Sequence, residues 1–527
     1  MATFTISTAA GFSMEQLNLF DLFEHAAETK SATLYKSLDD AANLTNFTGA
    51  GLTYAGAFPD TQLTGGTITG IQDIQGGATI FRILGASIPA VNLYNYYVAA
   101  DTVGALSEIL SGNDTLTGGA GNDVLVDLLG DNRFVGGLGA DIMRGGLGSD
   151  TYVVDNIEDV VDDADAFSGV NTVESSISYI MPQSISVLIL TGAAAINGRG
   201  RGAEFGPLND TIVGNNAANI LDGGTGNDTL SGGLGNDTYI VDTLGDSVID
   251  TGGSADEIQS YVSWFLSSNP AIEKLTLIGN AIRGDGNDLN NTITGNAFNN
   301  VLNGGGAGND LLIGGAGNDF LADGNGDNEL SQGTNTFKGE TGDDRYRVET
   351  ATDLVVELAG EGYDTVDSAI SYTLTANVER LNLDGFIAPL NATGNLLDNT
   401  LIGNFGDNTL NGLLGADIMR GGQGNDTYVV DNLGDRAIEN TNALVAGVAG
   451  GVDQVNSSVG FRLGAFVENL TLTGAGANSG IGNNLANVIT GNGAANIIDG
   501  KQGADTMIGG AGNDTYFRDD FGDTITD

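Results

Sequence analysis

The chain has 527 residues, of which 68 are acidic and 18 are basic, so its formal net charge is −50. So few basic side chains cannot neutralise a phosphate backbone, which excludes a general nucleic-acid binder and disfavours anionic membrane surfaces. Cysteine is absent, which excludes a disulfide framework and thiol catalysis. No apolar stretch approaches the length of a transmembrane helix.

Residues 1–110 contain no glycine-rich repeat, and we expect them to form a small α+β domain that caps the chain or binds a partner. Ser13 and Gln16 have the spacing of a capping box, which predicts a helix that runs to Ala26. A second helix is expected over residues 31–44. This is the one region that we expect to hold a distinct activity.

An alternating pattern predicts strands from Phe47 to Tyr97. Glycine pairs at 65–66 and 76–77 predict turns within this region. The tyrosines at 94–97 fit a docking surface for sugar or for a neighbouring subunit, and they fit the packed core of a β-element better. A short helix over residues 99–110 is expected to cap the remainder of the chain.

Glycine-rich nonapeptides extend through residues 111–527. Their glycines allow tight backbone turns, and an apolar residue two positions after each aspartate marks a minimal strand. A fixed period places the aspartates in rows, and rows of carboxylates need a cation because like charges repel at short range. The complete pattern G-G-x-G-x-D ends at Asp123, Asp141, Asp150, Asp228, Asp237, Asp310, Asp319, Asp426 and Asp514.

Carboxylate oxygens are hard ligands, which suit calcium better than zinc or copper. We therefore predict several bound calcium ions, held by aspartates in the repeat register. The alternative is a glycine-rich solenoid without metal, in which the rows of carboxylates would stay unneutralised. The predicted calcium ligands are Asp114, Asp123, Asp141, Asp150, Asp210, Asp228, Asp237, Asp310, Asp319, Asp344, Asp417, Asp426, Asp505 and Asp514.

The motif GGxGxDxUx resembles the RTX (repeat-in-toxin) nonapeptide of proteins that bacteria export by type I secretion. The resemblance implies an all-β fold, a parallel β-roll in which two nonapeptides make one turn. It implies calcium between loops eighteen residues apart, bound by aspartate carboxylates and loop carbonyls. It also implies export to the cell surface or the extracellular space, and it would explain why the N-terminus lacks a secretory signal peptide.

Several positions depart from this motif. Leu413 and Lys501 replace the second glycine before Asp417 and Asp505, which makes those two half-sites doubtful. Asparagine offers only a neutral oxygen, so we expect its turns to bind calcium weakly or to close through ladders of amide hydrogen bonds. Asparagine replaces the aspartate at Asn219, Asn291, Asn300, Asn399, Asn408, Asn487 and Asn496.

A longer repeat lies over the nonapeptides. Phrases such as GADIMRGGLGSDTYVVDN (139–156) recur about 87 residues apart, with a longer second interval. Between them lie alternating phrases such as ISVLILTG (185–192), which predict calcium-poor strands that continue one solenoid. The predicted blocks are roughly 111–180, 181–265, 266–370, 371–455 and 456–527.

Motifs for catalysis are missing. The sequence has a single histidine, His25, and it contains neither H-E-x-x-H nor G-x-S-x-G. Acidic residues are so abundant that paired carboxylates carry no information on glycosidic chemistry. We therefore expect that the protein is not an enzyme.

Three hypotheses for function remain. The first is a secreted calcium-binding protein that folds on calcium after export and self-associates in a surface layer, filament or matrix. The second is an adhesin that binds a ligand, such as cell-surface polysaccharide, through residues 1–110. The third is a secretion module attached to an unrecognised enzyme.

Overall fold

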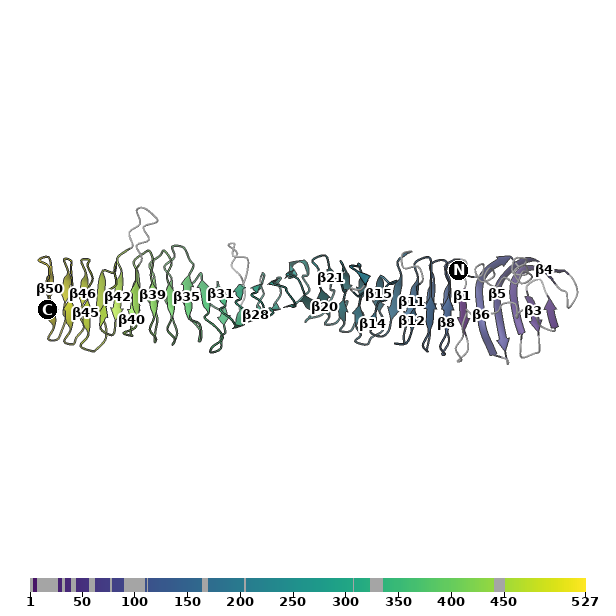
Figure 1. Cartoon of the computed structure of the whole chain (residues 1–527), viewed down its shortest axis with the longest axis horizontal. Coiled ribbons are helices and arrows are strands. Elements are labelled where there is room, and N and C mark those ends of the chain that lie inside the picture. Colours follow the sequence, from purple (N-terminus) through teal and green to yellow (C-terminus); the bar gives the residue numbers. More distant parts are fainter. Residues whose placement is uncertain are drawn as a thin grey trace. The chain divides into compact units, whose positions relative to one another are not determined.

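The computed structural model describes backbone strands between Thr3 and Pro89 and most of the chain from Gly112 onward. Two compact units are present, Met1–Asp256 and Glu257–Asp527. Each contains a parallel β-solenoid (Figure 1). The described residues are 3–6, 27–30, 34–38, 44–55, 62–75, 78–89, 110, 112–163, 169–202, 205–306, 308–322, 335–439 and 451–527.

The first unit starts with antiparallel strands. They pair in the order β2-β3-β4-β5-β6-β1, and β1 then pairs in parallel with β7, the first solenoid strand. The N-terminal strands therefore share a sheet with the solenoid. The domain boundary at residue 110 and the five blocks of the repeat region stay predictions. Their bounds are β1 Thr3–Ile6, β2 Ala27–Lys30, β3 Leu34–Leu38, β4 Leu44–Ala55, β5 Gln62–Gln75 and β6 Ala78–Pro89.

Two predictions for this region are wrong. The helix expected over residues 31–44 is replaced by β3, which pairs with β4, because a strand partner overrides weak local helix propensity. Gly65-Gly66, where we expected a turn, lies inside β5 at a point where the register with β4 shifts. Glycine is common at such β-bulges. Gly76-Gly77 falls between the antiparallel strands β5 and β6. That glycine pair, the helices expected over 13–26 and 99–110, the tyrosines at 94–97 and His25 lie outside the described residues.

The parallel strands of the solenoid in the first unit form three sheets. Their orders are β7-β9-β11-β13-β15-β17-β19-β21, then β8-β10-β12, then β14-β16-β18-β20. The bounds are β7 Thr115–Thr117, β8 Val124–Val126, β9 Arg133–Val135, β10 Ile142–Arg144, β11 Thr151–Val154, β12 Val160–Val161, β13 Thr172–Ser175, β14 Tyr179–Ile180, β15 Val187–Leu190, β16 Gly198–Arg199, β17 Thr211–Val213, β18 Ile220–Asp222, β19 Thr229–Ser231, β20 Thr238–Val241 and β21 Ser247–Ile249.

The second unit continues the same alternation of short strands. Its sheets are β22-β24-β26-β28-β30-β32, then β23-β25 through the odd strands to β41, then β34-β36 through the even strands to β50, then β43-β45-β47-β49. A short 3-10 helix, η4 Leu266–Ser268, follows β23, and the described residues contain no α-helix. The bounds are β22 Glu257–Ser260, β23 Trp264–Phe265, β24 Lys274–Leu277, β25 Arg283–Asp285, β26 Thr292–Thr294, β27 Val301–Asn303, β28 Leu311–Ala316, β29 Phe320–Ala322, β30 Thr336–Thr341, β31 Arg345–Val348, β32 Leu354–Val355, β33 Thr365–Ser368, β34 Tyr372–Thr373, β35 Arg380–Leu383, β36 Asn391–Thr393, β37 Thr400–Ile402, β38 Thr409–Asn411, β39 Ile418–Arg420, β40 Thr427–Val430, β41 Arg436–Ile438, β42 Gln454–Ser457, β43 Phe461–Arg462, β44 Asn469–Leu472, β45 Ser479–Ile481, β46 Val488–Thr490, β47 Ile497–Asp499, β48 Thr506–Ile508, β49 Thr515–Phe517 and β50 Thr524–Thr526.

The register confirms the predicted roll. Leu116 of β7 lies opposite Phe134 of β9, which lies opposite Tyr152 of β11, so one turn holds two nonapeptides. These three side chains are fully buried, and the rings of Phe134 and Tyr152 stack with centroids 5.1 Å apart. Most of the short strands thus turn one or two apolar side chains inward, and burial of these columns supplies the hydrophobic core. None of the helices in the described part of the chain is long and apolar enough to cross a membrane.

Candidate metal centre

The aspartate before each strand is part of a hydrogen-bonded column. In Asp123, the backbone N–H donates to Oδ1 of Asp141, eighteen residues later, at 2.7 Å. Asp141 donates in turn to Oδ1 of Asp159 at 3.0 Å. We call each such column of side chains a stack. In each aspartate that follows another residue in a stack, one carboxylate oxygen therefore holds adjacent turns together without a cation.

All of the predicted ligands belong to such stacks. Where aspartate is replaced, asparagine provides the same Oδ1 acceptor, and at two places a glutamate ends the column. The stacks are Asp114–Asn132–Asp150–Asn171, Asp123–Asp141–Asp159, Asp210–Asp228–Asp246, Asn219–Asp237–Asp256, Asn291–Asp310–Asn335–Asp353, Asn300–Asp319–Asp344–Asp364–Glu379, Asn399–Asp417–Asp435, Asn408–Asp426–Asp453–Glu468, Asn487–Asp505–Asp523 and Asn496–Asp514.

The second carboxylate oxygen of these aspartates is the one that could coordinate a cation. In many stacks this oxygen is buried and accepts no hydrogen bond, which is costly for a charged group. The exceptions include Asp123, whose Oδ2 accepts the N–H of Gly119 at 2.6 Å, and Asp150, whose Oδ2 accepts that of Gly146 at 3.3 Å. The predicted ligands with a buried Oδ2 that lacks a partner are Asp141, Asp228, Asp237, Asp319, Asp344, Asp417, Asp426, Asp505 and Asp514.

The second carboxylate oxygen leaves no room for a side chain at the first glycine of the loop. A Cβ placed on Gly136 would overlap the carboxylate of Asp141, and a Cβ on Gly421 would overlap that of Asp426. At Gly118 the added atom would also overlap the carbonyl oxygen of Gly136 in the next turn. Glycine thus lets carboxylate and carbonyl oxygens converge on one side of the turn.

Burial changes the acidity of these carboxyl groups. Desolvation raises the pKa of Asp141 and Asp319 to about 6, and that of Asp228 and Asp417 to about 7. Neighbouring carboxylates raise the pKa of Asp228 further. In the absence of a cation the stacks therefore favour protonation.

Asp210 differs from the other predicted ligands because an arginine neutralises it. Arg201 donates its backbone N–H to Oδ2 at 2.7 Å and its Nε to Oδ1 at 2.7 Å, and Asp210 is buried. Its guanidinium forms an ion pair with the same carboxylate at 2.5 Å. The charge of Asp210 is thus balanced by the guanidinium of Arg201.

The turns with asparagine close through amide hydrogen bonds, as expected. Asn408 accepts the N–H of Asn404 at 2.9 Å and donates to Leu390 O at 2.9 Å and to Asn404 Oδ1 at 3.0 Å. Asn404 occupies the place of the second glycine and donates to Ala388 O at 2.9 Å. The same G-N-x-x-x-N arrangement begins at Asn215, Asn287, Asn296, Asn395, Asn483 and Asn492.

The two substituted glycines keep the turn of the loop. Leu413 and Lys501 adopt φ values of 65° and 66°, in the left-handed region that Gly422 adopts with φ 105°. Both are strained positions for a residue with a side chain. The backbone before Asp417 and Asp505 is thus preserved at a cost in local strain.

Sequence reasoning missed the aspartates that end five of the stacks. Asp159 accepts the N–H groups of Asp155 and Asn156 through Oδ2, in addition to that of Asp141 through Oδ1. Both oxygens are therefore satisfied by backbone without a cation. The recurring phrase VDN-x-x-D could have revealed this group. The equivalent residues are Asp246, Asp353, Asp435 and Asp523.

The donor set fits calcium. It consists of buried, hard carboxylate oxygens without partners beside glycine carbonyls, and it lacks thiolate and imidazole. In the described residues, groups of three carboxylates close enough to share a metal ion also occur around Asp237, Asp344, Asp426 and Asp505. A bound calcium ion would neutralise the second oxygens and tie adjacent turns together.

Comparison with known proteins agrees with this geometry. A family model of four copies of the RTX calcium-binding nonapeptide repeat matches the chain in seven segments. None of the curated proteins matches it. The matched segments are 110–126, 117–152, 206–239, 285–321, 305–331, 393–428 and 474–525.

Proposed function

Because the chain is an RTX calcium-binding repeat protein, we propose that it binds several calcium ions in its stacks and folds when it does so. RTX repeats typically belong to secreted proteins, and we propose that this protein is exported before it meets calcium. The observation that carries the proposal is the set of buried Oδ2 atoms without partners, such as those of Asp141, Asp319 and Asp426.

The charge of the chain supports dependence on calcium. Adjacent turns of a sheet lie about 4.8 Å apart, at which two unit charges repel by about 3 kcal/mol at an effective dielectric of about 20. A formal net charge of −50 multiplies such repulsions along the chain. Without calcium, these repulsions oppose the compact state. With calcium, the same carboxylates become ligands, and their attraction to the ion stabilises the compact state.

We further propose a structural role in an extracellular assembly, such as a surface layer, filament or matrix, without catalysis. From residue 112 onward the described residues are almost entirely repeat, with inward apolar columns and stacks at the turns. Parallel sheets of this kind offer backbone edges on which another chain can pair. Self-association is therefore the partner interaction that we favour.

Electron microscopy with light scattering tests this role. Protein treated with chelator and then dialysed into millimolar calcium should form filaments or sheets, and the chelated sample should not. If calcium yields folded but isolated particles at every protein concentration, the assembly proposal is wrong while calcium binding stands.

A further inference from the structure

A recurring tyrosine marks one turn of each block. Its hydroxyl donates to a carboxylate eleven residues later: Tyr152 to Asp163 at 3.0 Å and Tyr239 to Asp250 at 2.7 Å. Tyr346 contacts Glu357 and Tyr428 contacts Glu439 in the same way. The tyrosine hydroxyl can also accept the N–H of the first glycine of the loop, as Tyr428 accepts that of Gly421 at 2.8 Å.

The acidic residue stands where the repeat has its first glycine. Glu439 lies eighteen residues after Gly421, and Glu357 lies eighteen residues after Gly339. A side chain at this position departs from the motif G-G-x-G-x-D. It places a carboxylate beside the stack at the turn where the nonapeptides of the block end.

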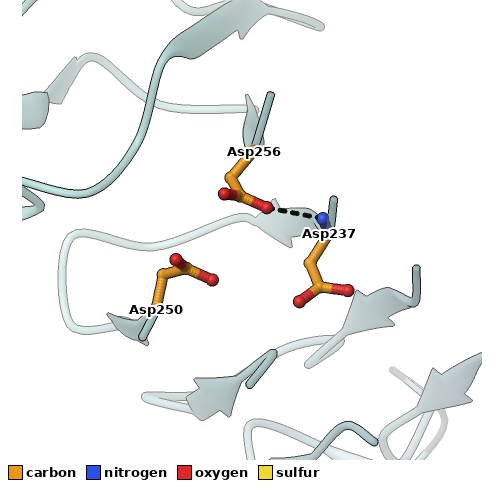
Figure 2. Close-up of side chains that lie close together, drawn as sticks. All are labelled: Asp237, Asp250 and Asp256. Atoms are coloured by element: carbon orange, nitrogen blue, oxygen red, sulfur yellow. Dashed lines mark hydrogen bonds between the residues drawn. The ribbon is translucent and has the colours of Figure 1, made fainter. Parts of the chain in front are cut away.

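Three carboxylates meet at this turn. Asp426, Glu439 and Asp453 offer ligand atoms that all lie within 4.8 Å of one another. The same holds for Asp344, Glu357 and Asp364, and for Asp237, Asp250 and Asp256. We call each set a triad. Figure 2 shows the third of these, with its carboxylates turned toward one another and the N–H of Asp237 donating to Asp256.

Buried oxygens without partners lie in the triad of Asp426, Glu439 and Asp453. Glu439 is 7% exposed and Asp453 is 0% exposed, so both are more than nine-tenths buried. Glu439 Oε2, Asp426 Oδ2 and Asp453 Oδ2 accept no hydrogen bond. The other oxygen of Glu439 is held by Tyr428, and that of Asp453 by the N–H of Asp426 at 2.8 Å. Each carboxylate is thus fixed through one oxygen and presents the other.

The first block provides a natural contrast. At the place of the third carboxylate it has Asn171, whose Oδ1 still accepts the N–H of Asp150 at 2.9 Å. The amide of Asn171 donates to Asp163 Oδ2 at 2.6 Å. In the first block, an amide thus gives the carboxylate a partner, which a cation would have to provide in the triads.

We propose that each triad binds one hard, multivalent cation through three side-chain carboxylates. This class of site is distinct from the loop sites, in which the second aspartate oxygens of a stack and glycine carbonyls would bind calcium. Each triad shares two of its carboxylates with a stack, as Asp426 and Asp453 show, so the proposal rests in part on the proposed function. Three carboxylates favour a highly charged ion. The triads therefore fill before the loop sites, and they prefer a trivalent lanthanide over calcium.

Native mass spectrometry of the full chain with terbium at sub-stoichiometric and saturating amounts tests this. Glu439→Gln keeps the size and the hydrogen bond to Tyr428, and it should lose one of the first ions to bind. Asn171→Asp supplies the missing carboxylate and should gain one ion. Asp163→Asn in the wild-type background should leave the count unchanged because the first block lacks a triad.

Asp141→Asn separates this proposal from the proposed function, because Asp141 belongs to a stack without a triad. A loss of calcium in Asp141→Asn, with counts unchanged in Glu439→Gln and Asn171→Asp, would overturn the triads and leave the loop sites standing. Unchanged counts in all of these variants would overturn both. Circular dichroism in saturating calcium confirms that each variant has folded.

Discussion

The stability of asparagine turns should not depend on calcium, whereas that of aspartate turns should, and two substitutions expose the difference. In Asn408→Ala, the accepted bond from Asn404 and the donated bonds to Leu390 and Asn404 are lost. Buried hydrogen bonds contribute about 1 kcal/mol each, so the local stability should fall by about 2–3 kcal/mol. The loss should be the same in calcium and in chelator because no cation takes part.

Asp141→Asn should behave differently. The asparagine keeps an Oδ1 acceptor for the N–H of Asp123, which Asp141 accepts at 2.7 Å, so stability in chelator should change little or rise. In calcium at a hundred times its dissociation constant, loss of one site should cost about 2.7 kcal/mol. Hydrogen exchange of the loop amides measures both variants under both conditions. An Asn408→Ala effect that appears only in calcium, or an Asp141→Asn effect equal in chelator, would refute the distinction.

The remaining predictions concern turns, strain and pH. Gly421→Ala should destabilise the fold by about 1–3 kcal/mol because its Cβ would overlap Asp426, whereas Gly493→Ala, with open space around it, should be neutral or stabilising in thermal melts. Leu413→Gly should raise the melting temperature by relieving a φ of 65°, and a lowered one would contradict this. Burial raises the pKa of Glu357 to about 9 and of Glu439 to about 8, so the folded state holds protons that the unfolded chain releases. In chelator, this stabilisation is complete below about pH 4 and is lost as the pH rises toward 9; melts in which stability rises with pH in chelator would disprove it.

Much of the solenoid could be predicted from the sequence because its period is strict. The nine-residue register places Leu116, Phe134 and Tyr152 in one buried column, and the structure has them there. The amide ladders follow from asparagine at Asn408 and its equivalents, since an amide both donates and accepts. In these turns, the residue types and the nine-residue register predict the same structure, so the sequence alone is enough to predict it.

The triads could not be predicted in this way because irregular spacing hides their register. Asp256 follows its stack partner by 19 residues, Asp364 by 20 and Asp453 by 27. Only the backbone hydrogen bonds of the folded chain show that these aspartates are equivalent. The ion pair of Arg201 with Asp210 also depends on a loop whose path no period specifies.

The prediction of a helix over residues 31–44 was wrong for a different reason. Local propensity favours a helix there, but β3 pairs with β4, the next strand along the chain, and β4 pairs with β5, the strand after it. The stabilisation that a strand gains from its pairing partners is not contained in the local propensity of one segment. The sheet order came from the structure alone.

Far-UV circular dichroism of the full chain, in chelator and in millimolar calcium, tests whether the fold depends on calcium. If the buried carboxylates need calcium, the chelated protein has a weaker β-sheet spectrum and a lower melting temperature, and calcium restores both. A chelated protein with the same β-sheet spectrum and the same melting temperature as the calcium-loaded one would contradict the account.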